Sequence, residues 1–331
     1  MPSRIEDYAL IGDCHAAALV ARNGSIDWLC WPRFDSDACF AALLGTGDHG
    51  RWLIAPRDGE ARVTRAYRQN TLILETRFEC REGAVRLIDF MPIDRTRTHT
   101  HGSIVRLVIG ERGKVDMRTE LILRFGYGAV VPWVQKLEDD TLRAIAGPDM
   151  VVLRTPVVLT GRHLTHEGEF TVGEGDKVPF VLSYGPSHLP PPPALDAAAE
   201  LAGTEAFWTK WAAKCLPAGP WSDALVRSMI TLKALTYAPT GGIVAAPTTS
   251  LPEQLGGARN WDYRFCWLRD STFTLYALIG AGFIEEAEAW RDWLLRAVVG
   301  SAMQIQTLYG VAGERRLTEH TVDWLPGYEN S

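Results

Sequence analysis

Apolar and polar residues alternate with a period of two from the start of the chain to about residue 186, as in half-buried β-strands. The pair Asn23-Gly24, between the apolar runs 18–21 and 26–29, is a strong signal for a two-residue hairpin. Many short strands without intervening helices predict a large antiparallel β-sandwich. Further strand-like runs, the first two of which form a second hairpin, occupy residues 71–78, 84–90, 103–109, 116–125, 141–146, 150–154, 168–173 and 178–184.

The alternation ends at a proline-rich segment. Residues 190–193 are four consecutive prolines, which enforce an extended polyproline conformation and enter neither helix nor sheet. We therefore place a domain boundary here. Residues 1–188 are the predicted β-sandwich domain, 189–195 the linker and 196–331 a second domain.

After the linker the apolar period changes to 3.6 residues, which predicts helices. The second stripe follows a candidate N-cap at Ser222. About four helical segments are expected, from 196–215 to 284–298, so the second domain is predicted to be all-α. The apolar stripes consist of Leu201, Trp208, Trp211 and Cys215; of Leu225, Met229, Leu232 and Leu235; and of Ala287, Trp290, Leu294 and Ala297.

Composition narrows the class of protein. The 331 residues are 47% hydrophobic, which is ample material for two cores. The net charge of −6 and the absence of any basic block argue against a nucleic-acid or anionic-membrane partner. No apolar run reaches membrane-spanning length and the first residues contain no signal-peptide hydrophobic region, so we expect a cytoplasmic protein.

No metal or cofactor is predicted. The six cysteines include no Cys-x-x-Cys pair, and Cys266 has no accompanying base that would make it a nucleophile. His99 and His101 alternate without a third ligand nearby and are interpreted as surface histidines. Residues 45–50 match Gly-x-Gly-x-x-Gly but open no helix, so they are interpreted as a turn and not as a dinucleotide site.

Candidate chemistry is concentrated in residues 259–270, which hold aromatic rings, three arginines and two aspartates. Flat rings cover the C–H faces of a sugar, while Arg and Asp clamp its hydroxyls. In the structural alternative, Asp270 is an N-cap and Trp261 and Trp267 are core residues. The setting favours a sugar site, because residues 247–268 show no helical periodicity and a structureless run of this length is usually functional.

These motifs resemble a known family. The run Gly-Gly-Ile-Val-Ala-Ala-Pro-Thr-Thr-Ser-Leu-Pro-Glu at 241–253, followed by Trp-Asp-Tyr-Arg and Trp-Leu-Arg-Asp, looks like glycoside hydrolase family 15. That family holds glucoamylases, glucodextranases and bacterial trehalases. The segments 9–13 and 23–32 resemble the amino-terminal domain of its bacterial trehalase-like members.

The resemblance implies a fold in which a β-supersandwich precedes an (α/α)6 barrel of twelve helices. The sugar is bound at the barrel end formed by the loops that join the helices. Because about four helical segments are visible here, we expect an antiparallel β-supersandwich followed by only the first helices of the barrel, a truncated form.

The resemblance also implies roles for individual residues. Arg269 and Asp270 match the pair that hydrogen-bonds hydroxyls of the terminal glucose, and Trp267 is the aromatic residue two positions earlier. Trp261 and Asp262 match the Trp-Asp of the same loop. The expected partner is an α-glucoside, either trehalose or an α-glucan oligosaccharide.

The family cleaves glycosides with inversion, which needs a general acid and a general base about 6.5–9.5 Å apart. Neither catalytic glutamate's motif is present in the sequence. The candidate catalytic acids Glu253, Glu314 and Glu319 belong to no recognised catalytic motif. The acid and base are therefore expected beyond Ser331, and the chain itself is predicted to be inactive.

Two functions remain open at this point. The chain is either the amino-terminal part of an inverting exo-α-glucosidase or a non-catalytic carbohydrate-binding or structural β-sandwich module. We favour the first, because a terminus inside a toroid is expected to leave apolar residues such as Trp290 and Trp293 unburied. The amino-terminal motifs favour a trehalase-like substrate, and the sequence does not indicate an oligomeric state.

Overall fold

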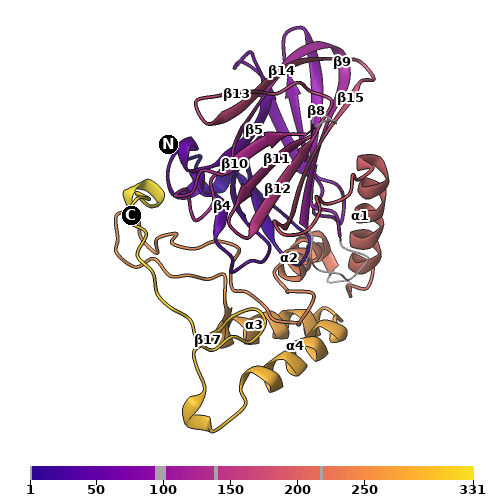
Figure 1. The fold of residues 1–331 in the computed structure, drawn as a ribbon. Coiled ribbons are helices and arrows are strands. Elements are labelled where there is room, and N and C mark those ends of the chain that lie inside the picture. The colour runs from indigo at the N-terminus through magenta and orange to yellow at the C-terminus, as the bar shows by residue number, and fades with distance from the viewer. Residues whose placement is uncertain (1, 94–101, 138–140, 217–218) are drawn as a thin grey trace.

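The computed structural model describes residues 2–93, 102–137, 141–216 and 219–331 (Figure 1). His99 and His101 lie outside the described residues. The first part of the chain is built of strands, which are β1 (Tyr8–Gly12), β2 (Ala17–Ala21), β3 (Ser25–Cys30), β4 (Ala38–Phe40), β5 (Arg51–Pro56), β6 (Arg62–Tyr67), β7 (Leu74–Glu79), β8 (Gly83–Phe90), β9 (Gly102–Ile122), β10 (Trp133–Lys136), β11 (Leu142–Ala146), β12 (Asp149–Arg154), β13 (Thr160–Arg162), β14 (Thr165–Gly173) and β15 (Lys177–Pro186).

These strands are hydrogen-bonded into one 15-stranded sheet that folds into two layers at β9. The amino-terminal half of this 21-residue strand pairs with β8 and β15. Its carboxyl-terminal half pairs with β5 and β14. Every pairing is antiparallel, so the predicted large antiparallel sheet is confirmed. The Asn23-Gly24 hairpin joins β2 to β3, with Gly24 at a φ of 85°.

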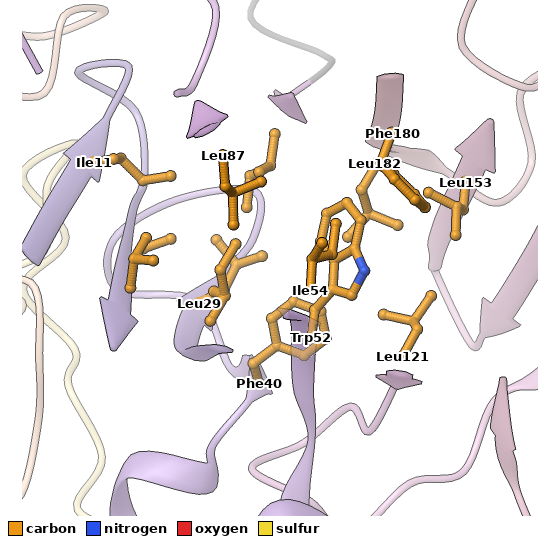
Figure 2. Packing of buried hydrophobic residues seen from close by; sticks show 14 of the residues in the cluster. Ile11, Leu29, Phe40, Trp52, Ile54, Leu87, Leu121, Leu153, Phe180 and Leu182 are labelled. Carbon is orange, nitrogen blue, oxygen red and sulfur yellow. The ribbon is translucent and has the colours of Figure 1, made fainter. Parts of the chain in front are cut away.

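The two layers bury one continuous apolar core (Figure 2). Trp52 and Phe180 meet across it, with ring centroids 6.4 Å apart and nearly perpendicular planes. One charged pair lies in the same interior. Arg106 Nε donates to Asp89 Oδ1 at 2.7 Å, and its other nitrogens donate to the carbonyls of Trp52 and Gly24. The Arg106 guanidinium is therefore paired and fully hydrogen-bonded, as a buried charge must be.

Within the described residues, four α-helices follow the sandwich, which agrees with the expected number, and three of them coincide with the predicted apolar stripes. No helix among them is both long and apolar enough to cross a membrane. Asp196 caps the first helix by accepting the amides of Ala198 and Ala199. The N-cap prediction at Ser222 is wrong: Trp221 holds that position, and the Ser222 hydroxyl donates to Gly219 O. The helices are α1 (Ala197–Ala212), α2 (Ser222–Ala234), α3 (Leu268–Gly280) and α4 (Ile284–Ala297).

The helices share apolar clusters with the sandwich. Cys14 and Leu72 pack with Trp208 and other residues of α1 and α2, and Ala17 and Phe34 pack with residues of α4. Trp290 and Trp293, which a terminus inside a toroid is expected to leave unburied, both lie inside this second cluster. The large apolar side chains that do face solvent on α3 and α4 are Phe273, Tyr276, Ile279, Ile284 and Leu295.

Glu286 on α4 joins three helices from a buried position. Its carboxylate accepts the indole N–H of Trp211 on α1 at 2.6 Å and lies 3.2 Å from Lys233 Nζ on α2. Burial opposes ionisation, but the Lys233 ammonium and the Trp211 hydrogen bond outweigh it and lower the pKa of Glu286. The carboxylate thus carries a negative charge that both partners stabilise.

We expect Glu286→Ala to destabilise the fold by about 3 kcal/mol, because it leaves the Lys233 ammonium and the Trp211 N–H buried without an acceptor. The matched control is Glu285→Ala, which removes only an exposed ion pair with Lys214 and should leave the unfolding midpoint unchanged. Urea unfolding followed by circular dichroism measures both. Equal effects of the two variants contradict the assigned role of Glu286.

Candidate functional site

The segment that the sequence marked as functional forms a long hairpin between α2 and α3. Its arms, residues 245–253 and 259–265, are joined by four backbone hydrogen bonds of 2.8–3.2 Å; we call residues 245–265 the hairpin loop. The outermost of these bonds runs from Glu253 N to Arg259 O. As the sequence predicts, residues 245–265 contain no helix or strand. Their backbone is nevertheless paired across the hairpin and includes one isolated bridge, between Thr249 and Asp262.

Two glycines fix the base of the hairpin loop. Gly241 has a φ of 83°, and a Cβ on it would lie 2.5 Å from Ala289 O. A Cβ on Gly242 would lie 2.6 Å from Val311 O. Only glycine allows the backbone to pass this close to α4 and to residue 311. The carboxyl-terminal end of the hairpin loop continues into strand β16 (Cys266–Trp267), which pairs with β17 (Leu308–Tyr309).

Arg264 attaches the hairpin loop to the sandwich. Its side chain is 4% exposed. The guanidinium donates to Ser36 O and to the Tyr127 hydroxyl, both at 2.6 Å, and both acceptors belong to the β-sandwich. It also binds the Asp262 carboxylate, with Nη2 2.6 Å from Oδ2 and Nε 3.0 Å from Oδ1. These acceptors satisfy a buried cation from both the sandwich and the loop.

The sequence did not single out Arg264, and its contacts change the interpretation of Asp262. Both Asp262 carboxylate oxygens accept from Arg264, so this residue is first a partner that neutralises a buried charge. Its predicted contact with sugar stays a prediction. The signal that the sequence offered was the Asp-x-Arg spacing, which is common and carries no indication of burial.

Arg269 and Asp270 lie in the first turn of α3, where Arg269 is exposed and Asp270 is half-buried. Arg269 Nη2 is 3.1 Å from Asp270 Oδ2, and the two side chains are 66% and 30% exposed. The helix begins at Leu268 with Trp267 as N-cap, so the alternative that Asp270 is an N-cap is wrong. Among the described residues, each of these two side chains bonds only to the other.

The two tryptophans have different surroundings. Trp267 is half-buried; its indole N–H donates to Asp262 O at 3.0 Å, and its ring lies 5.4 Å from that of Tyr263. Trp261 is exposed, so the alternative that it is a core residue is wrong. Its N–H donates to Glu253 Oε1 at 2.8 Å, and the Arg259 guanidinium lies over its ring. An aromatic face is thus held at the surface of the hairpin loop.

The remaining candidate acids do not form an acid–base pair among the described contacts. Glu253 is bound to Trp261 and Arg259. Glu314 lies 2.8 Å from Arg33 Nη1 and accepts Ala312 N. Burial opposes its ionisation, yet backbone hydrogen bonds and Arg33 outweigh this and lower its pKa, which disfavours a proton donor. Glu319 is exposed.

Cys266 is not a nucleophile of the usual activated kind. It is fully buried on β16, and desolvation, aided by the Asp35 charge, raises the pKa of its thiol. A reactive cysteine needs a lowered pKa and access to solvent. Among the residues described, no group of three or more His, Cys, Asp or Glu side chains is placed to hold a metal ion.

Comparison with known proteins assigns the sequence that forms this site to a family. A model described as "Trehalase-like, N-terminal" matches residues 1–182, and "Glycosyl hydrolases family 15" matches residues 219–331. The chain belongs to glycoside hydrolase family 15. The matched family 15 region contains the whole hairpin loop, Arg264 and the Arg269–Asp270 pair.

Curated relatives match along nearly the whole chain. A trehalase of Mycolicibacterium smegmatis is 34% identical, and a trehalase of Thermoplasma volcanium is 31% identical. Each match covers 99% of this chain and 52% of the relative, so the chain spans about half the length of these proteins. A solved structure titled putative kojibiose phosphorylase, from human microbiome, is 9% identical and covers 81% of this chain and 44% of its own, with a TM-score of 0.42.

The attachment of the hairpin loop to the sandwich through Arg264 can be tested with a pair of arginine variants. Arg264→Met should destabilise the protein by about 3 kcal/mol, because it leaves Asp262 and Tyr127 without their partner in a largely buried site. Arg269→Met, which removes an exposed guanidinium, should leave stability unchanged. Hydrogen exchange of the Ala246 and Ser250 amides, which are bonded across the loop, should accelerate in the first variant alone. Unchanged exchange in Arg264→Met overturns the assignment.

Proposed function

We propose that this chain forms the glucose-recognition part of a glycoside hydrolase that acts on α-glucosides, with trehalose as the preferred substrate. The observation that carries the proposal is the Arg269–Asp270 pair, partly open to solvent and two residues after Trp267, in a family 15 motif. The trehalases named above support trehalose over α-1,4 and α-1,6 glucans. We further propose that α1–α4 are the first helices of an (α/α)6 barrel.

Recognition follows from the chemistry of the exposed groups. Arg269 supplies N–H donors and Asp270 supplies carboxylate acceptors, so together they bind neighbouring hydroxyls that both donate and accept. The bond between them is exposed and therefore weak, and a sugar replaces it without leaving a buried charge. The rings of Trp267 and Trp261 offer apolar faces for the C–H side of the sugar.

Hydrolysis by the whole enzyme is proposed to invert the anomeric carbon. In that mechanism a carboxylic acid protonates the leaving oxygen while a carboxylate activates water on the opposite face. Glu253 and Glu314 are both occupied by other groups, so we assign neither role to them. The 331 residues are proposed to bind the sugar and to leave the bond intact.

A non-catalytic carbohydrate-binding module remains the second candidate. Its support is the exposed Trp261, which Glu253 and Arg259 hold at the surface in the manner of a stacking platform. The two candidates differ in which residue dominates binding. The hydrolase site depends on Arg269 and Asp270, whereas a surface platform depends on Trp261.

We expect the chain to bind trehalose weakly, and Asp270→Asn or Arg269→Met to reduce affinity about tenfold, as expected for the loss of a charge-assisted bond of about 1.5–3 kcal/mol. The matched controls are Asp292→Asn and Arg291→Met, because Arg291 and Asp292 form an equivalent exposed pair on α4. Isothermal titration calorimetry or ligand-observed NMR measures the affinity. Trp261→Ala is measured in the same way. If it alone loses affinity for trehalose, the binding module is favoured, and if the α4 controls lose as much affinity as the Arg269 and Asp270 variants, both assignments are contradicted.

The purified 331-residue chain should release no glucose from trehalose, maltose or isomaltose above background. Without a general acid and base it forgoes two contributions that are each typically worth 10²–10⁴-fold in rate. A coupled glucose assay tests this, and proton NMR of fresh product identifies the first anomer. Release of β-glucose that Glu314→Gln abolishes would show that Glu314 has a catalytic role.

A further inference from the structure

A cavity lies between the outer face of the sheet and the start of α1, away from the hairpin loop. Its volume is about 460 Å³, and its lining comes from β9, β12, β15 and residues 194–198. Helix α1 lies along this side of the sheet, whereas α3 and α4 lie below it (Figure 1). No residue lining the cavity belongs to the hairpin loop or to α3. The cavity is thus separate from the proposed sugar site.

Apolar side chains form most of its wall. Leu107, Val181 and Leu195 line it together with Pro179. The first three also belong to, or pack against, the apolar cluster that joins α1 to the sheet. These walls are therefore fixed by packing. The volume falls in the range of small-molecule sites, about 300–1,000 Å³.

Two cations, the half-buried Arg154 and the exposed Lys177, line the same cavity with one acid. Arg154, at the end of β12, has its Nη1 buried with no hydrogen-bond acceptor. Among the described residues, neither Arg154 nor Lys177 forms an ion pair. The one acid on the lining is Asp196, whose Oδ1 is already bound to the Ala198 and Ala199 amides. A buried guanidinium nitrogen without an acceptor is unfavourable, and the lining carries two positive side chains against one negative side chain.

We propose that this cavity binds an organic anion with a hydrocarbon body, such as a medium-chain carboxylate. The carboxylate pairs with the Arg154 guanidinium in a charge-assisted hydrogen bond, and Lys177 adds a second positive charge. The hydrocarbon body lies against Leu107, Val181 and Leu195. Small inorganic anions fit less well, because they leave these apolar walls uncovered.

Octanoate, below its micellar concentration, is the probe for this site, and calorimetry is the measurement. We expect saturable one-to-one binding to the full chain, with octanol and octyltrimethylammonium at least about tenfold weaker, as the loss of a charge-assisted bond predicts. Arg154→Met should weaken octanoate about tenfold and Lys177→Met by less. Arg162→Met, which removes an exposed arginine of β13 outside the cavity, should have no effect.

Thermal unfolding with and without octanoate distinguishes a variant that has lost binding from a variant that fails to fold. Without ligand, Arg154→Met should melt at or above the wild-type temperature, because it removes an unpaired cation. Octanoate should raise the melting temperature of the wild type and not that of Arg154→Met. Equal binding of octanol and octanoate, undiminished binding by Arg154→Met, or no saturable binding to the wild type each overturns the proposal. So does inorganic phosphate binding that depends on Arg154 while octanoate fails to bind.

Discussion

Burial of one guanidinium group fixes where the candidate site lies. Arg264 is almost inaccessible to water, and its acceptors come from both the sandwich and the hairpin loop. Because a buried cation is tolerated only while its acceptors stay in place, the loop cannot move away from the sandwich without a penalty of several kcal/mol. Trp28 adds a second tie by donating its indole N–H to Pro247 O at 2.7 Å. The β-sandwich thereby determines the position of Trp267 and of the pair that follows it.

The same dependence extends through the interface between the strands and the helices. The proline run separates them in sequence, but Arg227 on α2 lies over the Tyr67 ring at 4.2 Å and donates to Thr71 O. Arg68 Nη1 lies 2.6 Å from Glu205 Oε2 on α1. These contacts and the shared apolar clusters cross the predicted domain boundary at residue 188. The composition of the chain changes there, but the packing of side chains is continuous. An isolated sandwich would expose the side chains that it shares with the helices.

Periodicity predicted the element types well, because the switch from two to 3.6 residues reports directly on burial geometry. It could not predict that β9 serves both layers, since alternation is identical in either layer. It also could not separate the arginines of the 259–270 stretch. Arg259, Arg264 and Arg269 look alike in sequence, yet their side chains are 72%, 4% and 66% exposed. Only tertiary contacts with Ser36 and Tyr127 make the middle residue structural and leave Arg269 open to a ligand.

The hydrogen bonds of the three buried arginines can be compared with those of Arg154. Arg106 has Asp89 and two carbonyls, Arg124 has the carbonyls of Leu123 and Leu164, and Arg264 has Asp262 with two further oxygen acceptors. Each satisfies the rule that a charge removed from water must be paired or hydrogen-bonded. Arg154 is half-buried, and its Nη1 is buried without such an acceptor beside an apolar cavity. Among the described residues, the Nε of Arg143 is also buried without an acceptor, but Arg143 does not line the cavity. Arg154 is therefore the position at which an acceptor from outside the chain fits.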